Sequence, residues 1–175
     1  MILVIVELAL VFTVSGAINR IGTGAATALF MIYAALNGLT LSALFIVYAH
    51  ASLASAFIVT AGTFAACSLH GFVTKTDLTS LGSFLFMALI GLVIASVVNI
   101  FFASSMLYWL ITYAGVLIFV GLTAYDTQKL KMIAIQTEGA PELAARLSVV
   151  GALSLYLDFI NLFLFMLRLM GNRRD

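Results

Sequence analysis

The sequence predicts an all-α membrane protein, a polytopic bundle of about six transmembrane helices in one domain spanning residues 1–175. Of its residues, 64% are hydrophobic and 9% are charged, and the mean hydropathy is +1.22. Soluble domains carry roughly 45–50% apolar and about 25% charged residues. At about 20 residues for each helical crossing of a roughly 30 Å hydrocarbon core, the chain suffices for about six crossings and leaves little for a second domain.

Six apolar runs separated by short polar breaks mark these spans. Their lengths and their interspersed Gly, Ala and Ser residues favour helices over barrel strands, which are about 10 residues long and alternate strictly. Small residues also let membrane helices pack closely. The predicted spans are residues 1–19, 25–49, 52–73, 80–102, 106–130 and 147–170.

The two ends of this series need separate arguments. The first run contains Glu7 and lacks a basic leader and a small-residue cleavage site, so we interpret it as a retained span and not as a signal peptide. A membrane protein that begins in mid-helix is unusual, and we expect an upstream segment to be missing. Before the last span, residues 128–146 have the composition of a loop, with a turn at residues 136–141 that contains the only proline, Pro141.

The distribution of basic residues predicts the orientation. If six spans alternate, one side carries five basic residues and the other carries three. The positive-inside rule then places the loop between Lys129 and Arg146 in the cytoplasm and the C-terminus outside. The five are Arg20, Lys75, Lys129, Lys131 and Arg146, and the three are Arg168, Arg173 and Arg174.

Composition also excludes several classes of function. The net charge of +1 comes from 8 basic and 7 acidic residues that form no basic stripe, which argues against nucleic-acid binding. The sequence contains no phosphate-binding glycine-rich loop and no serine-hydrolase or zinc-protease motif. We therefore expect no enzymatic activity and no tightly bound cofactor.

Four ionisable residues lie inside the apolar runs, where each is costly and needs a partner, a wet cavity or a role. Asp158 has no cation three or four residues away, so its own helix does not neutralise it. A hydrogen bond to a hydroxyl such as that of Ser154 or Tyr156 is the structural alternative. Asp126 has Lys129 three residues on, so a local ion pair is the alternative there. The four residues are Glu7, Asp126, Asp158 and Arg168.

The two aspartates are predicted to face each other. Their spans form a hairpin, and their distances along the chain from its turn place them about 6 Å apart in depth at about 1.5 Å per residue. Two carboxylates held close in a low dielectric share a proton, which makes a pH sensor. Deprotonated, they offer hard oxygen ligands to a cation such as Ca²⁺, with Asn161, Thr127 or backbone carbonyls as candidates for further ligands.

Three charged residues near the ends of the spans could support such a pair. Glu7 and Arg168 are predicted to lie in the same leaflet, where they form a structural ion pair or an outer pore pair, unless Arg168 extends to the interface. Arg20 lies on the side of the aspartates. It is either a latch that binds them when they are ionised or an anchor that fixes the topology.

The segments Gly121–Lys129 and Leu153–Phe163, followed by Arg168, resemble the Bax inhibitor family and in particular its bacterial members. This resemblance implies a seven-helix fold with a central last helix, here without the first helix. Known members are pH-sensitive Ca²⁺ leak channels whose di-aspartyl sensor matches Asp126 and Asp158. An outer pore role is implied for Glu7 and Arg168, and Arg20 is the counterpart of the family's latch arginine.

These expectations combine into one functional hypothesis with alternatives. We expect a pH-sensitive calcium leak channel of the bacterial inner membrane, gated by protonation of the aspartate pair, with Ca²⁺ and H⁺ as its ligands. The resemblance also implies a non-transporting regulator of a membrane-bound ATP-dependent protease, and an aspartate pair is equally a proton relay for a transporter. An intramembrane aspartyl protease is disfavoured because its Gly-x-Gly-Asp and Pro-Ala-Leu motifs are absent.

Overall fold

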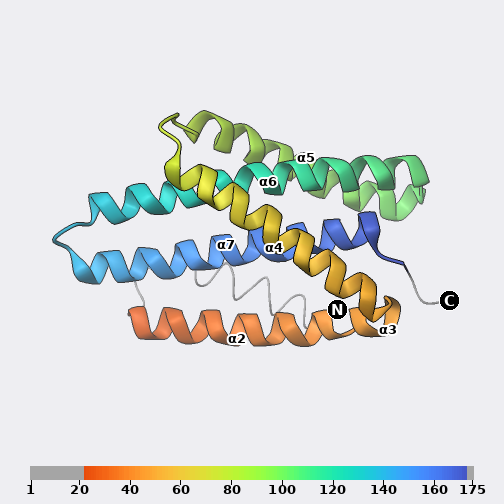
Figure 1. The fold of residues 1–175 in the computed structure, drawn as a ribbon, viewed down its shortest axis with the longest axis horizontal. Helices are drawn as coiled ribbons and strands as arrows, with labels where there is room; N and C mark the ends of the chain where they lie inside the picture. The colour runs from red at the N-terminus through yellow and green to blue at the C-terminus, as the bar shows by residue number, and fades with distance from the viewer. Residues whose placement is uncertain (1–21, 173–175) are drawn as a thin grey trace.

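The computed structural model of the chain describes residues 22–172, which form helices joined by short connections (Figure 1). Five helical segments in this range are long and apolar enough to cross a membrane, and no strand occurs in it. The predicted helical membrane bundle is therefore confirmed. The predicted span 1–19 lies outside the described residues. The helices are α2 (Thr23–Ser42), α3 (Leu44–Val47), α4 (His50–Val73), α5 (Thr79–Phe102), α6 (Ser105–Gln136) and α7 (Pro141–Met170).

The connection between α5 and α6 is closed by local polar contacts. Ala103 ends α5 in the left-handed conformation, with φ of 47°. The Asn99 side chain accepts a hydrogen bond of 3.0 Å from the Ser104 backbone, and the Ser104 hydroxyl accepts one of 3.3 Å from the Leu107 backbone. These bonds satisfy backbone groups that the helix ends leave unpaired, so the two residues between the helices, Ala103 and Ser104, suffice to reverse the chain.

The prediction of a long loop at residues 128–146 is wrong, because only Thr137–Ala140 separate α6 from α7. Met132, Ile133 and Ile135 continue the helical pattern, and no helix breaker occurs before Gly139, whose φ is 92°, and Pro141, which begins α7. With 32 residues, α6 is about 48 Å long at about 1.5 Å per residue. It therefore exceeds the roughly 30 Å hydrocarbon core and extends beyond it.

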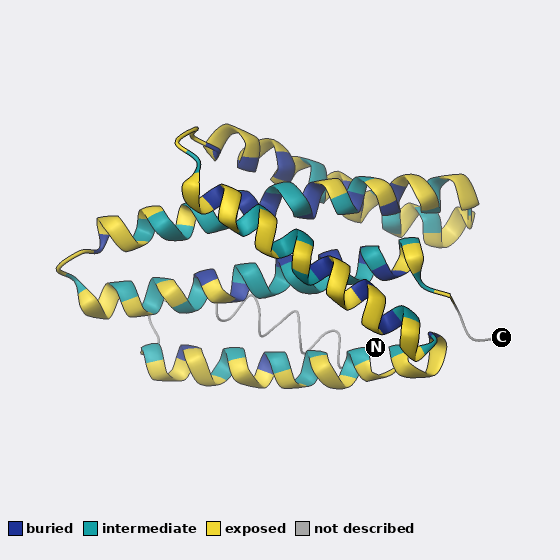
Figure 2. Cartoon of the chain, in the orientation of Figure 1, coloured by how far each residue is buried: buried dark blue, intermediate teal, exposed yellow. Residues whose placement is uncertain are grey.

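The α6–α7 hairpin forms the centre of the bundle (Figure 1). α6 contacts α4, α5 and α7, while α7 contacts α2, α4 and α6. Burial follows this arrangement (Figure 2). In the most apolar 18-residue segment of each helix, 39% of the segment is buried in α6 and 11% in α5. The outer faces carry large exposed apolar side chains, such as Phe101 and Met106, each 80% exposed. In a membrane protein such residues face lipid.

Glycines allow the central helices to approach closely. A Cβ added at Gly71 of α4 would collide with the backbone of Ala124 in α6. One added at Gly115 of α6 would lie 2.5 Å from the ring of Phe165 in α7. Both glycines thus lie where a neighbouring helix touches the backbone, and they fix the positions of α4 and α7 against the α6 segment that carries Asp126.

Candidate functional site

The structure brings Asp126 of α6 and Asp158 of α7 together. Their carboxyl groups lie close enough to interact with each other. Asp158 is only 4% exposed, and Asp126 is half-buried. Both line a cavity of about 800 Å³ between α5, α6 and α7. The sequence predicted this juxtaposition from the hairpin alone.

The contact between the two carboxyl groups has a chemical consequence. An ionised carboxylate only accepts hydrogen bonds, so two carboxyl groups bond to each other only when one of them carries a proton and donates it. The Oδ2 atom of Asp158 is buried and has no hydrogen-bond partner within the described range. A buried acceptor of this kind is costly unless a water or another donor satisfies it. A proton held between the two carboxyl groups would let them bond to each other.

Two of the polar neighbours proposed from the sequence bond to their own helices. The Thr127 hydroxyl donates to the Thr123 carbonyl at 2.8 Å. The Asn161 amide nitrogen donates to the Leu157 carbonyl at 2.8 Å. Asn161 lines the same cavity as the aspartates, and its amide oxygen is an acceptor.

The hydroxyl residues considered as structural partners of Asp158 differ from each other. Ser154 lines the aspartate cavity. The Tyr156 hydroxyl donates a hydrogen bond of 3.2 Å to Asn37 in α2, and the Tyr156 ring packs edge-on against Phe30 and Tyr33. Tyr156 therefore joins α7 to α2.

Lys129 does not form the local ion pair considered for Asp126. No contact within 4.0 Å joins the two side chains, and the Lys129 ammonium lies 6.0 Å from the centroid of the Tyr125 ring. Its positive charge still acts on the Asp126 carboxyl group. Asp126 therefore lies beside Asp158 across the hairpin, and the positive charge of Lys129 acts on its carboxyl group from a longer distance.

The remaining predicted site residues lie elsewhere. Arg168 is exposed near the end of α7, with its guanidinium 6.0 Å from the Tyr108 ring centroid and 5.2 Å from that of Phe165. It lines a separate cavity of about 490 Å³ together with Asn99. Glu7 and Arg20 lie outside the described residues, and so do the predicted Glu7–Arg168 pair and the Arg20 latch.

The metal-binding groups of the site are few. In residues 22–172, no cluster of three or more His, Cys, Asp or Glu side chains has the arrangement of a metal site. The residues with side-chain oxygen atoms that line the cavity are Asp126, Asp158 and Asn161, together with the hydroxyl residues Ser83, Tyr125 and Ser154.

One residue of the site region was missed by the sequence analysis. Gln128, two positions after Asp126, accepts a hydrogen bond of 2.8 Å from the Leu78 backbone and donates one of 2.8 Å to the Thr76 carbonyl. It thereby ties the α4–α5 connection to α6. A single glutamine at a helix end gives no signal of a partner 50 positions away.

Comparison with known proteins gives a family and several bacterial relatives. The family model described as "Inhibitor of apoptosis-promoting Bax1" matches residues 1–175. The chain is 57% identical to the inner membrane protein YbhL of Escherichia coli K12 over 174 residues, which are 98% of this chain and 74% of that protein. It is 49% identical over 175 residues to an uncharacterized protein of Borreliella burgdorferi, covering 100% of this chain and 75% of the relative. It is 50% identical over 173 residues to an uncharacterized protein of Deinococcus radiodurans, covering 99% and 74%.

Proposed function

The chain belongs to the Bax inhibitor family, and from this premise we propose that it is a pH-sensitive leak channel for Ca²⁺, gated by protonation of the Asp126–Asp158 pair. The observation that carries the proposal is the contact between these two carboxyl groups beside a cavity in the centre of the bundle. The pair acts as a sensor and a transient cation site and has no hydrolytic role.

Electrostatics make the pair a suitable switch. Two unit negative charges about 4 Å apart repel each other by about 4 kcal/mol at an effective dielectric of about 20. Loss of the shared proton therefore changes the energy of the α6–α7 contact by a few kcal/mol. A two-state equilibrium needs a bias of this size to shift its population strongly.

The apolar core between the two cavities is the proposed barrier to ions. The aspartate cavity and the Arg168 cavity are both lined by α5, α6 and α7, at different heights along these helices. Between them, residues of the three helices form a buried apolar cluster, in which the rings of Phe119 and Phe165 stack at 5.9 Å. Hydrophobic constrictions of this kind exclude ions until they are widened and wetted. Opening therefore requires α5 or α7 to move relative to α6.

In this proposal the aspartate pair binds the permeating cation transiently and is not a tight binding site. Conduction needs a site that favours entry and still lets the ion leave. Two carboxylates and one amide oxygen leave most of the six to eight ligand positions of Ca²⁺ to water. Protons and Ca²⁺ then compete for the same oxygen atoms.

Location and orientation form part of the proposal. The similarity to an inner membrane protein of Escherichia coli supports the inner membrane of a bacterium. We assign the α6–α7 turn to the cytoplasm and the C-terminus to the outer side, because more basic residues lie on the side of that turn. The aspartate pair then responds to cytoplasmic pH.

The decisive experiment is Ca²⁺ entry into dye-loaded proteoliposomes between about pH 5 and 8. We expect flux to rise as the pH falls, and we expect Asp126→Asn and Asp158→Asn to abolish this pH dependence. Asp77→Asn is the matched control, because Asp77 is exposed in the α4–α5 connection outside the helices. Flux that keeps its pH dependence in both aspartate variants would reject the sensor.

Absence of flux from folded protein at every pH would reject the channel itself. That outcome would favour a non-transporting regulator of another membrane protein, such as a membrane-bound ATP-dependent protease. Uphill Ca²⁺ movement driven by a pH gradient would instead indicate a proton-coupled transporter.

A further inference from the structure

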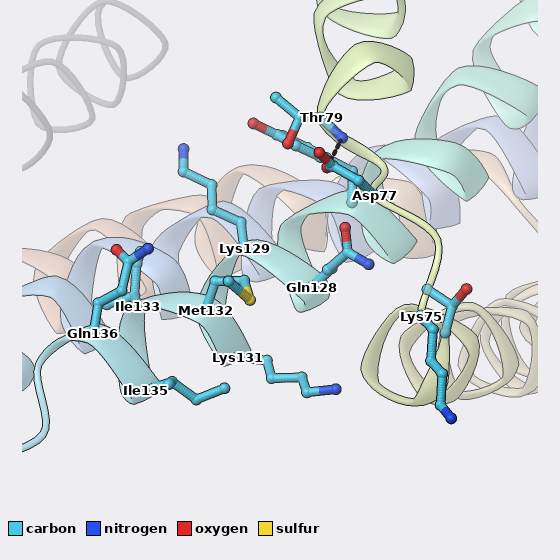
Figure 3. Close-up of a pocket in the computed structure, with 12 residues that line it drawn as sticks. Lys75, Asp77, Thr79, Gln128, Lys129, Lys131, Met132, Ile133, Ile135 and Gln136 are labelled. Atoms are coloured by element: carbon cyan, nitrogen blue, oxygen red, sulfur yellow. Dashed lines mark hydrogen bonds between the residues drawn. The ribbon is translucent and has the colours of Figure 1, made fainter.

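A second large cavity lies next to the aspartate cavity, at the end of α6 that extends beyond the hydrocarbon core (Figure 3). Its volume is about 790 Å³, and it lies between α6 and the connection from α4 to α5. Three lysines line it, together with one acidic residue, Asp77. The lysines are Lys75, Lys129 and Lys131.

The positive charge of this cavity is not balanced from within. Hydrogen bonds from the side chain and backbone of Thr79 hold the pKa of Asp77 below its usual range, so this carboxylate is ionised at neutral pH. Three lysines line the same cavity. None of the three lysines forms an ion pair within 4.0 Å in the described part of the chain, whereas Arg146, outside the cavity, pairs with Glu142 at 3.6 Å. The cavity therefore carries an excess of positive charge.

The ammonium groups are spread around the cavity. The Lys131 ammonium donates a hydrogen bond of 2.7 Å to the Phe72 carbonyl at the end of α4, which uses one of its three N–H groups. Figure 3 shows Lys131 extending from α6 toward the connection that carries Lys75, while Lys129 extends in another direction. A small inorganic anion is held tightly by donors that converge on one point. This wider arrangement fits an extended anionic group.

Apolar side chains form the adjoining wall. Met132 and Ile135 of α6 line the cavity and are 46% and 56% exposed. Phe72, beside Lys131, is 55% exposed. Exposed apolar side chains next to lysines, where a helix leaves the hydrocarbon core, match the boundary between acyl chains and headgroups.

We propose that this cavity binds the headgroup of an anionic phospholipid, with Lys75, Lys129 and Lys131 placing positive charge around the headgroup and Met132 and Ile135 against the acyl region. Lys129 also lines the aspartate cavity. The bound headgroup therefore lies next to the Asp126–Asp158 pair. It interacts with Lys129, whose positive charge also acts on Asp126. Binding does not depend on the leak function, because it is measured without flux.

The test is lipid retention by the whole chain in neutral detergent, counted by native mass spectrometry during titration with phosphatidylglycerol or phosphatidylcholine. We expect saturable retention of phosphatidylglycerol and little retention of phosphatidylcholine. A membrane-surface lysine contributes about fivefold to binding of an anionic lipid, so Lys75→Gln with Lys129→Gln should lower the affinity at least about tenfold. Neither of these lysines donates a hydrogen bond that holds α4, so this double variant spares the contact made by Lys131.

Two controls separate a site from general attraction. Arg146→Gln removes one positive charge at the same end of the bundle but outside the cavity, and it should leave phosphatidylglycerol retention unchanged. Replacement of Lys75 and Lys129 by arginine should preserve retention. An equal loss in Arg146→Gln and the double variant would overturn the site, and so would displacement of the lipid by millimolar inorganic phosphate, which would indicate a free-anion site.

Discussion

Phe165 of α7 packs its ring against Gly115 of α6, at a position where any larger residue would intrude. Gly115→Ala should therefore destabilise the bundle by about 1–3 kcal/mol, because the ring must move in a packed core. Gly91→Ala is the matched control. A Cβ at Gly91 meets nothing within 4 Å, so that change should be neutral or slightly stabilising. Thermal unfolding in detergent measures both, and equal midpoints would contradict the packing assigned to Gly115.

Gly71 should be more sensitive than Gly115. The atoms that a Cβ would meet there belong to the backbone of Ala124, which cannot rotate away as a side chain can. Gly71→Ala should cost about 3 kcal/mol or more and should push α4 away from α6. Gly62→Ala, in the same helix but with open space around it, is the control. Crosslinking between cysteines introduced on the facing sides of α4 and α6 would detect the separation.

Gln128 is predicted to hold the α4–α5 connection in place. Gln128→Leu removes both of its hydrogen bonds and leaves the Leu78 N–H and the Thr76 carbonyl without this partner. We expect a loss of about 1–3 kcal/mol and faster hydrogen exchange in residues 76–79. Gln136→Leu, at the exposed end of the same helix, should change neither. Unaltered exchange in Gln128→Leu would show that the connection is held by other contacts.

Asp77 gives a prediction on pH dependence. Because Thr79 holds its pKa below the usual range, the stabilisation from this contact is complete above the unfolded pKa of about 3.9. It is lost as the pH falls through the lower folded value. Thr79→Ala removes the hydroxyl donor and should raise the pKa of Asp77 toward its ordinary value. Carboxyl ¹³C shifts of labelled aspartate measure this, with Thr76→Ala as the control.

The fold was largely predictable because hydropathy reports directly on which segments contact lipid. Five of the predicted runs match described helices: residues 25–49 match α2 with α3, and the others match α4, α5 and the parts of α6 and α7 away from their connecting turn. The ends of α6 and α7 at their connecting turn were not predicted, since polar residues such as Gln128 and Lys131 occur both in loops and on a helix that has left the membrane. The short break at Ala43 between α2 and α3 also has no sequence signal, because neither proline nor glycine lies there.

The candidate site also has a part that the sequence predicts and a part that it does not. Asp126 and Asp158 were found because a charge inside an apolar run is conspicuous and because a hairpin fixes the relative depth of its two helices. The role of Gln128 depends on contacts across 50 positions of sequence, and polar residues at helix ends are too common to identify such a role. The cavity around Lys75, Lys129 and Lys131 arises from the same long-range packing.

The extension of α6 beyond the bilayer makes the hairpin a lever. From Asp126 to Gln136 the helix is about 15 Å long, and α7 accompanies it after a connection of four residues, Thr137–Ala140. A tilt of about 10° around the aspartate pair would displace the tip by about 2.6 Å, whereas the carboxyl groups themselves would hardly move. If protonation of the pair gates the protein as proposed, it should therefore produce motion at the water-exposed turn, which a spin label placed there would record.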